Sequence, residues 1–150
     1  MKLILMISEE EANKRVQEGC IRSWVVFEAL AIKENVAKDA LENLIEKLDK
    51  DDRVKIYKKN FGEANKVEKP MQGVDFGYSL TCEVNLVSKS FDNLANIAIE
   101  YGPSALEILE PEKIILKMGE AQAILNSIAN MMHRIAAAGA GGIVFMKGGD

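Results

Sequence analysis

Tyr78-Ser79-Leu80-Thr81-Cys82-Glu83-Val84-Asn85-Leu86-Val87 is the stretch in which apolar and polar side chains alternate most regularly. Successive side chains of a β-strand point to opposite faces of the sheet, so this alternation predicts a strand over 78–87. Its apolar set consists of Leu80, Cys82, Val84 and Leu86, and we expect these side chains to share one buried face. The rest of the fold prediction depends on that face.

Two segments, one on each side of this strand, have the pattern of helices that cover its apolar face. Asn35 is a favourable N-cap for a helix that extends to about Leu48. The apolar stripe of this helix consists of Ala37, Ala40, Leu41, Leu44, Ile45 and Leu48. Ser90 caps a second helix, which Gly102 and Pro103 end. Its apolar residues are Phe91, Leu94, Ala95 and Ala98.

Three further segments are predicted to be strands. Residues 24–32 are almost continuously apolar, which favours a central strand covered on both faces. Residues 53–60 alternate, which favours a half-buried edge strand, and 106–109 form a short strand ended by Glu110 and Pro111. The order β-α-β-β-α-β predicts an α+β, ferredoxin-like sandwich with the strands in the order fourth, first, third, second.

A short helix is predicted before this core. Ser8 and Glu11 form a capping box, which starts a helix over 9–18, and Gly19 ends it. Whether the first six residues join the sheet stays open.

A long helix is predicted after the core, over 120–138, with one apolar face and a polar face that carries the surface residue His133. The glycine-rich 139–142 follows it, and a short strand is predicted at 143–146. The helix therefore adds an amphipathic element to the sandwich.

The chain is expected to be one domain, 1–150. Its parts are an N-terminal extension at 1–22, the ferredoxin-like core at 23–116, and the final helix with its glycine-rich tail at 117–150. Residues 61–76 form the longest irregular stretch, with glycines, a proline and several charges, and are expected to be a loop or an extended hairpin.

The composition is that of a globular protein. A net charge of −4 gives no general attraction for nucleic acid, so a nucleic-acid partner is not expected. No stretch reaches the length of a membrane span, and the start lacks a secretory signal. The two distant cysteines, Cys20 and Cys82, form no metal-binding spacing, which favours a reducing, cytoplasmic compartment. Cys20 lies near Arg22, but no base accompanies it, so we interpret it as an ordinary thiol.

The sheet face opposite the two core helices is the first candidate for a site. Strand alternation places polar side chains there, and our candidate ligand-binding residues are Glu28, Tyr57, Thr81, Glu83 and Asn85, with Glu107 nearby. Carboxylates beside a tyrosine favour cation binding or acid–base chemistry. The alternative is a solvated or covered face, because alternation alone produces such rows. We therefore predict no catalytic residue, no metal site and no cofactor.

An RNA-binding reading is also open. Domains of this fold that recognise RNA have an aromatic-Gly-aromatic segment on the third strand, and Phe76-Gly77-Tyr78 is similar to it. Such a site would use Tyr57 together with these two rings. The sequence departs from the pattern, because Asp75 precedes the segment and Ser79 follows it where other residue types are usual.

The segment Tyr101-Gly102-Pro103-Ser104-Ala105-Leu106-Glu107-Ile108-Leu109-Glu110-Pro111-Glu112 resembles the end of the C-terminal extension of WYL-domain regulators. In that extension a helix runs into a glycine and then into a strand, inside a ferredoxin-like unit. The resemblance implies only this local geometry. The abundance of Lys, Glu and Ile also resembles small uncharacterised archaeal proteins.

The final helix offers a surface for self-association. Its apolar residues at the candidate interface are Ile124, Ile128, Met131, Met132 and Ile135. A single small domain is not expected to bury this whole stripe. We therefore predict a non-enzymatic homo-oligomer, a dimer or larger, that acts as a small-molecule-binding or regulatory module. The alternatives are an enzyme or metal site on the open sheet face and an RNA-binding domain.

Overall fold

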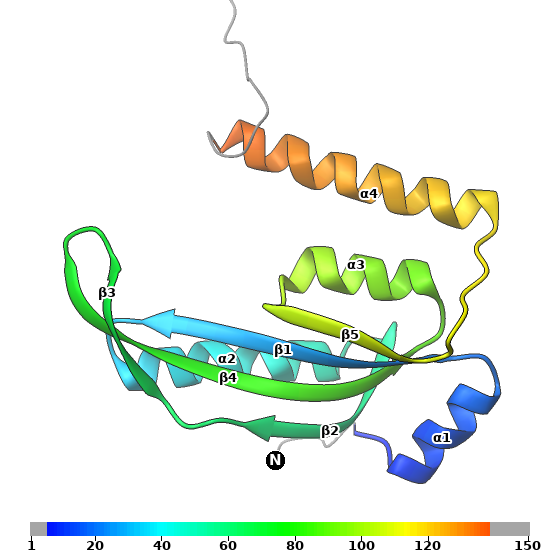
Figure 1. Cartoon of the computed structure of the whole chain (residues 1–150), viewed down its shortest axis with the longest axis horizontal. Coiled ribbons are helices and arrows are strands. Elements are labelled where there is room, and N and C mark those ends of the chain that lie inside the picture. The colour runs from blue at the N-terminus through cyan, green and yellow to red at the C-terminus, as the bar shows by residue number, and fades with distance from the viewer. Residues whose placement is uncertain (1–5, 139–150) are drawn as a thin grey trace, which may run out of the picture. The chain divides into compact units, whose positions relative to one another are not determined.

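The computed structural model describes residues 6–138, which fall into two compact units, Met1–Ile114 and Ile115–Asp150 (Figure 1). The elements of the first unit are α1 (Glu9–Gln17), β1 (Ile21–Ala31), α2 (Glu34–Asp49), β2 (Val54–Phe61), β3 (Asn65–Met71), β4 (Val74–Ser88), α3 (Phe91–Tyr101) and β5 (Ala105–Glu110). The second unit contains α4 (Met118–Ala137). The expectation of one domain stays a prediction.

The first unit is built on an antiparallel five-stranded sheet, which makes the protein an α+β protein. The strand order is β2-β4-β1-β5, and β3 pairs separately with β4. Read from the other edge, this order is β5, β1, β4 and β2. These are the strands predicted at 106–109, 24–32, 78–87 and 53–60, for which the sequence predicts the order fourth, first, third, second. The fifth strand, β3, lies in the stretch 61–76, for which the sequence leaves a loop or an extended hairpin open.

Strand β4 is the longest in the sheet and organises it. It pairs with β1 along the full length of β1, and on its other side it pairs first with β3 and then with β2. Strands β2 and β3 therefore behave as one long strand interrupted at residues 62–64. Figure 1 shows the β3–β4 hairpin extending beyond the end of β1.

The irregular stretch expected over 61–76 is mostly strand. Met71 pairs with Val74, and Gly73 in the turn between them has φ +82°. The hairpin alternative is therefore the correct one. The irregular loop was wrong because β3 is exposed on both faces, so its sequence has no alternation between apolar and polar residues.

The predicted buried face of β4 is confirmed. Leu80 is 6% exposed, and Cys82, Val84 and Leu86 are fully buried. The register with β1 places Val25 opposite Val84 on this face. Helices α2 and α3 cover it, and their buried residues, which belong to the same cluster as the strand residues, are Leu41, Ile45, Leu48, Leu94, Ile97 and Tyr101.

Of the three predicted N-caps, two agree with the structure and one does not. The hydroxyl oxygens of Ser8 and Ser90 accept hydrogen bonds from backbone N–H groups three residues later, as predicted for N-caps. Asn35 was wrong as the N-cap of α2, because the helix begins at Glu34 and the cap position is Lys33, whose side chain makes no capping bond. Ala40 of the predicted stripe is exposed.

Strand β1 is central but is fully covered on one face only. Its buried residues alternate from Ile21 to Phe27, whereas Glu28 on the other face is exposed. Coverage on both faces was therefore wrong. The physical reason is that an antiparallel sheet tolerates one solvated face, and the apolar run alone does not reveal which residues face water.

A polar cluster joins the end of α3 to the turn before β2. Arg53 Nη2 donates to Asp51 Oδ2 at 2.7 Å and to Glu100 Oε2 at 2.6 Å, and the Tyr101 hydroxyl donates to Asp51 at 2.9 Å. The hydrogen bonds from Arg53 hold the pKa of Asp51 well below its usual range. Burial and the bond to Asp51 raise the pKa of Tyr101 to about 12.

Helix α4 is the only element described in the second unit. It begins at Met118, two residues before the predicted start, and Ala136 is its buried residue. No helix among residues 6–138 is both long and apolar enough to cross a bilayer. The glycine-rich 139–142 and the strand predicted at 143–146 lie outside the described residues.

Candidate functional site

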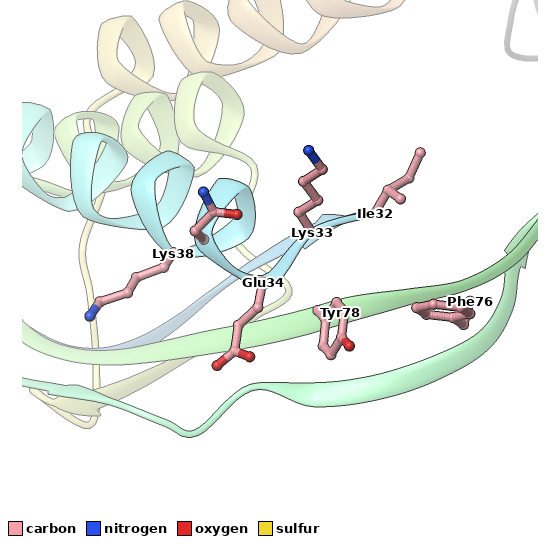
Figure 2. A pocket seen from close by; sticks show the side chains of 7 residues that line it. Ile32, Lys33, Glu34, Lys38, Phe76 and Tyr78 are labelled. Carbon is pink, nitrogen blue, oxygen red and sulfur yellow. The ribbon is translucent and has the colours of Figure 1, made fainter.

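An open pocket of about 650 Å³ lies where α2 begins, beside the first half of β4 (Figure 2). Three segments of the first unit form its walls: the connection from β1, the first turn of α2 and β4. Its lining residues are Ile32, Lys33, Glu34, Asn35, Lys38, Phe76 and Tyr78.

The pocket forms where the first residues of β4 extend past the end of β1. Tyr78 pairs with Ala31, the last residue of β1, so Phe76 lies beyond the part of β4 that β1 covers. Both rings follow the alternation of Leu80 and therefore belong to the face that α2 covers. Helix α2 begins at this level, so its first turn borders the rings without burying them.

Gly77 lets three segments meet between the two rings. A Cβ atom at this position would lie 3.0 Å from the carbonyl oxygen of Ala31 and 3.2 Å from Cγ of Pro70. Any larger residue would push β1 or the β3 segment away. The glycine thus fixes where Phe76 and Tyr78 stand relative to α2.

The two rings form an aromatic corner. Their centroids are 6.1 Å apart and their planes are nearly perpendicular, at 88°. Lys66 Nζ of β3 lies 4.3 Å from the Phe76 centroid, a cation–π contact that holds one side of the ring. Phe76 is nevertheless 41% exposed, and Ile32 across the pocket is 63% exposed.

Charges of both signs surround the corner. In Figure 2 the ammonium groups of Lys33 and Lys38 point in opposite directions, and the carboxylate of Glu34 points to the same side as the Tyr78 ring. The lining thus combines ring faces and an aliphatic side chain with an amide, a phenol and three charged groups. Among residues 6–138, no group of three or more His, Cys, Asp and Glu is placed to hold a metal ion.

Four of the predicted ligand-binding residues share the opposite sheet face. The register places Glu28 opposite Thr81, and it places Val26 and Trp24 opposite Glu83 and Asn85 respectively. The carboxylate of Glu28 accepts a hydrogen bond of 2.9 Å from the Ser79 hydroxyl. These residues form a row along the sheet, and none of them lines the pocket at α2.

Tyr57 lies on the same face as these four residues but in a separate cluster, at the end of the sheet near α1. The Arg22 guanidinium carbon lies 5.1 Å from the Tyr57 ring centroid, and Arg22 Nη2 donates to Asn13 Oδ1 of α1. Arg22 Nε also lies 3.5 Å from Glu110 Oε2 of β5. Tyr57 therefore packs against an arginine that joins four elements, on the face opposite Phe76, and the three rings of the RNA-binding reading do not form one surface.

Comparison with known proteins gives the chain its family. Residues 22–143 match the model of the MJ0538 family. The chain belongs to the MJ0538 family. No curated protein and no solved structure matches it. None of these comparisons extends the local resemblance of 101–112 to WYL-domain regulators.

The part of the chain that matches the MJ0538 family model contains all three walls of the pocket and the whole of α4. Sequence reasoning missed this pocket, although Phe76-Gly77-Tyr78 was the signal that marks it. The triplet was read for RNA stacking on the open face, whereas the register places both rings on the helix side.

Burial affects the thiols of both cysteines. Burial raises the pKa of the Cys20 thiol, and it outweighs the lowering effect of nearby Arg15. Burial likewise raises the pKa of Cys82 to about 11. Both are free thiols, which agrees with reading Cys20 as an ordinary residue.

Proposed function

We propose that this protein is a non-enzymatic small-molecule-binding module whose ligand occupies the pocket between the start of α2 and β4. One observation carries the proposal: Phe76, Tyr78 and Ile32 present apolar surface to an open cavity, next to charged groups that would orient a bound molecule. A regulatory role fits such a module, because ligand binding there links α2 to the β3–β4 hairpin.

The chemistry of the walls defines the ligand class. Burying an apolar surface is favourable by about 25 cal/mol per Å², and the ring faces that stay exposed to water do not gain this free energy. A flat, partly apolar or aromatic molecule recovers it by covering the corner. Polar substituents on that molecule then meet Asn35, the Tyr78 hydroxyl or the charged side chains at the rim.

A thermal-shift screen with aromatic metabolites tests the proposal. A ligand of the native state must raise the melting temperature, and Phe76→Ala should abolish that rise while leaving the fold intact. Phe61→Ala is the matched control, because Phe61 is 38% exposed on β2 and does not line the pocket.

The result that contradicts the proposal is equally specific. A metabolite that shifts the wild type and the Phe76→Ala variant by the same amount binds elsewhere. A screen in which no flat aromatic compound stabilises the protein also counts against it.

The open sheet face supports a second candidate, a cation-binding or acid–base site. Glu28 and Glu83 lie on that face on adjacent strands, with Thr81 directly opposite Glu28. In this case Glu83→Gln would abolish stabilisation by divalent cations, whereas Phe76→Ala would not change it.

We also propose that the core is ferredoxin-like, with β3 added by extension of the β2–β4 hairpin. The support is the order of β5, β1, β4 and β2 and the burial of α2 and α3 in one cluster with the shared face of β4. Finally, we propose that the chain forms a homo-oligomer through α4, whose apolar residues include the exposed Leu125 and Ile128.

A further inference from the structure

The apolar residues of α4 follow a heptad pattern. Ala121, Ile124, Ile128, Met131 and Ile135 are spaced alternately by three and four residues, which is the seam of a coiled coil. A second row, Met118, Leu125 and Met132, recurs every seven residues along one flank of this seam. Asn126 and His133 occupy the outermost position of the heptad, away from the seam.

Among the described residues of the second unit, no other element covers this face. Its seam residues Ala121, Ile124, Met131 and Ile135 are half-buried, whereas three other residues of the face are exposed. Met118 is 85% exposed, Leu125 is 66% exposed and Ile128 is 40% exposed. Helix α4 is the only element described in the second unit, and a single helix gains most of its stability by packing its apolar face against another element. The heptad spacing and the charges beside it can therefore be used to infer which partner packs against this face.

The charges beside the seam specify the partner. Glu120 and Arg134 are two heptads apart, and each directly precedes a seam residue. In an antiparallel pair of α4 helices in which Ile124 packs against Ile128 of the partner subunit, Glu120 lies beside Arg134 of the partner subunit, and symmetry makes this pair twice. In a parallel pair Glu120 would lie beside Leu125 of the partner subunit, and no opposite charges would meet.

We infer that α4 pairs with α4 of a second copy of this chain in an antiparallel coiled coil. This inference rests on the proposed self-association and adds its orientation and register. Ile124 packs against Ile128 of the partner subunit in two equivalent central layers, and Ala121 packs against Met131 of the partner subunit. Leu125 meets Leu125 of the partner subunit on the flank, so the wide apolar row is covered as well.

Charge reversal tests the orientation. Light scattering over a dilution series measures the dissociation constant of the dimer for the wild type, for Glu120→Arg, for Arg134→Glu and for the double variant. Each single change replaces two opposite-charge pairs with two like-charge pairs and should raise the dissociation constant by about tenfold. The double variant restores both pairs and should return to the wild-type value.

A control and three outcomes complete the test. Asn126→Arg introduces a positive charge on the outer face and should leave the dimer unchanged, and circular dichroism verifies that every variant folds. A wild type that stays monomeric at micromolar concentration overturns both the self-association and its geometry. A dimer that tolerates the single changes, or that the double variant fails to restore, overturns the antiparallel register alone.

Discussion

Gly77 is the residue on which the pocket depends most directly. The carbonyl oxygen of Ala31 and the ring of Pro70 both approach the space that a Cβ atom would fill. Neither neighbour is the end of a flexible chain, so neither moves away easily. Gly77 separates the exposed ring of Phe76 from the half-buried ring of Tyr78, and its small size keeps both rings beside the start of α2.

We expect Gly77→Ala to destabilise the protein by about 1–3 kcal/mol, the usual cost of forcing an extra methyl group into a packed site. Urea unfolding measures this change. Gly119→Ala is the matched control, because nothing lies within 4 Å of its Cβ position and alanine is the better helix former, so it should be neutral or stabilising. Equal effects of the two substitutions would contradict the close approach at Gly77.

Asp51 gives the protein a stability that depends on pH. Its pKa is lower in the folded state than in the unfolded state, so its contribution is complete above about pH 5 and is lost as the pH falls. We expect Asp51→Asn to cost about 1.5–3 kcal/mol at neutral pH, since a hydrogen bond to a charged group contributes about that much.

The measurement is chemical denaturation from neutral pH down to about pH 3. The stability difference between the wild type and Asp51→Asn should shrink as the pH falls from about 5 to 3, because the unfolded state protonates Asp51 in this range while the folded state keeps it ionised. A constant difference across this range would show that the Asp51 charge is not the source of the effect.

At the scale of elements, the parts with a strong local signal were predictable. The alternation at Leu80 to Leu86 gave the central strand and its buried face, and Ser8 and Ser90 marked two helix starts because their side chains cap locally. Asn35 misled the prediction of α2, since its neighbour Lys33 takes the cap position without using a side chain. The start of a helix was therefore predictable where a side chain makes the capping hydrogen bond, and was misplaced where no side chain makes it.

The β3–β4 hairpin and the pocket were not predictable in the same way. Strand β3 buries no residue, so it forms through backbone pairing to β4 and leaves no apolar pattern in the sequence. The pocket depends on where β1 ends relative to β4, which is a property of the register between two distant segments. By contrast, strand alternation alone was enough to predict that Glu28, Thr81, Glu83 and Asn85 share one face of the sheet.

At the scale of the whole molecule, the division at Ile114 separates two roles. The first unit holds the sheet, the covering helices and the pocket, and the second holds the helix proposed to pair with another copy. The core cluster draws its buried residues from the first unit alone. The proposed ligand site and the proposed oligomer interface therefore lie in different parts of the chain.

We expect a chain that ends at Ile114 to fold, to keep the ligand response of the Phe76 pocket and to be monomeric. Cooperative urea unfolding, the thermal-shift response and light scattering measure these three properties. The full-length chain is the reference for each. A truncated chain that still dimerises would exclude α4 as the interface, and one that fails to fold would show that the first unit needs the second.

The projection of the β3–β4 hairpin past β1 gives the pocket two walls of different rigidity. The α2 wall is anchored by Leu41 and Ile45 in the core, while Phe76 lies on the two-stranded β3–β4 ribbon, whose strand β3 buries no residue. A molecule that contacts both walls must restrict the motion of the ribbon. The conformational entropy lost in this ordering lowers the affinity. If a ligand fills the pocket as proposed, we expect the ribbon tip to be more ordered in the occupied protein than in the empty one, and a second macromolecule could recognise that difference.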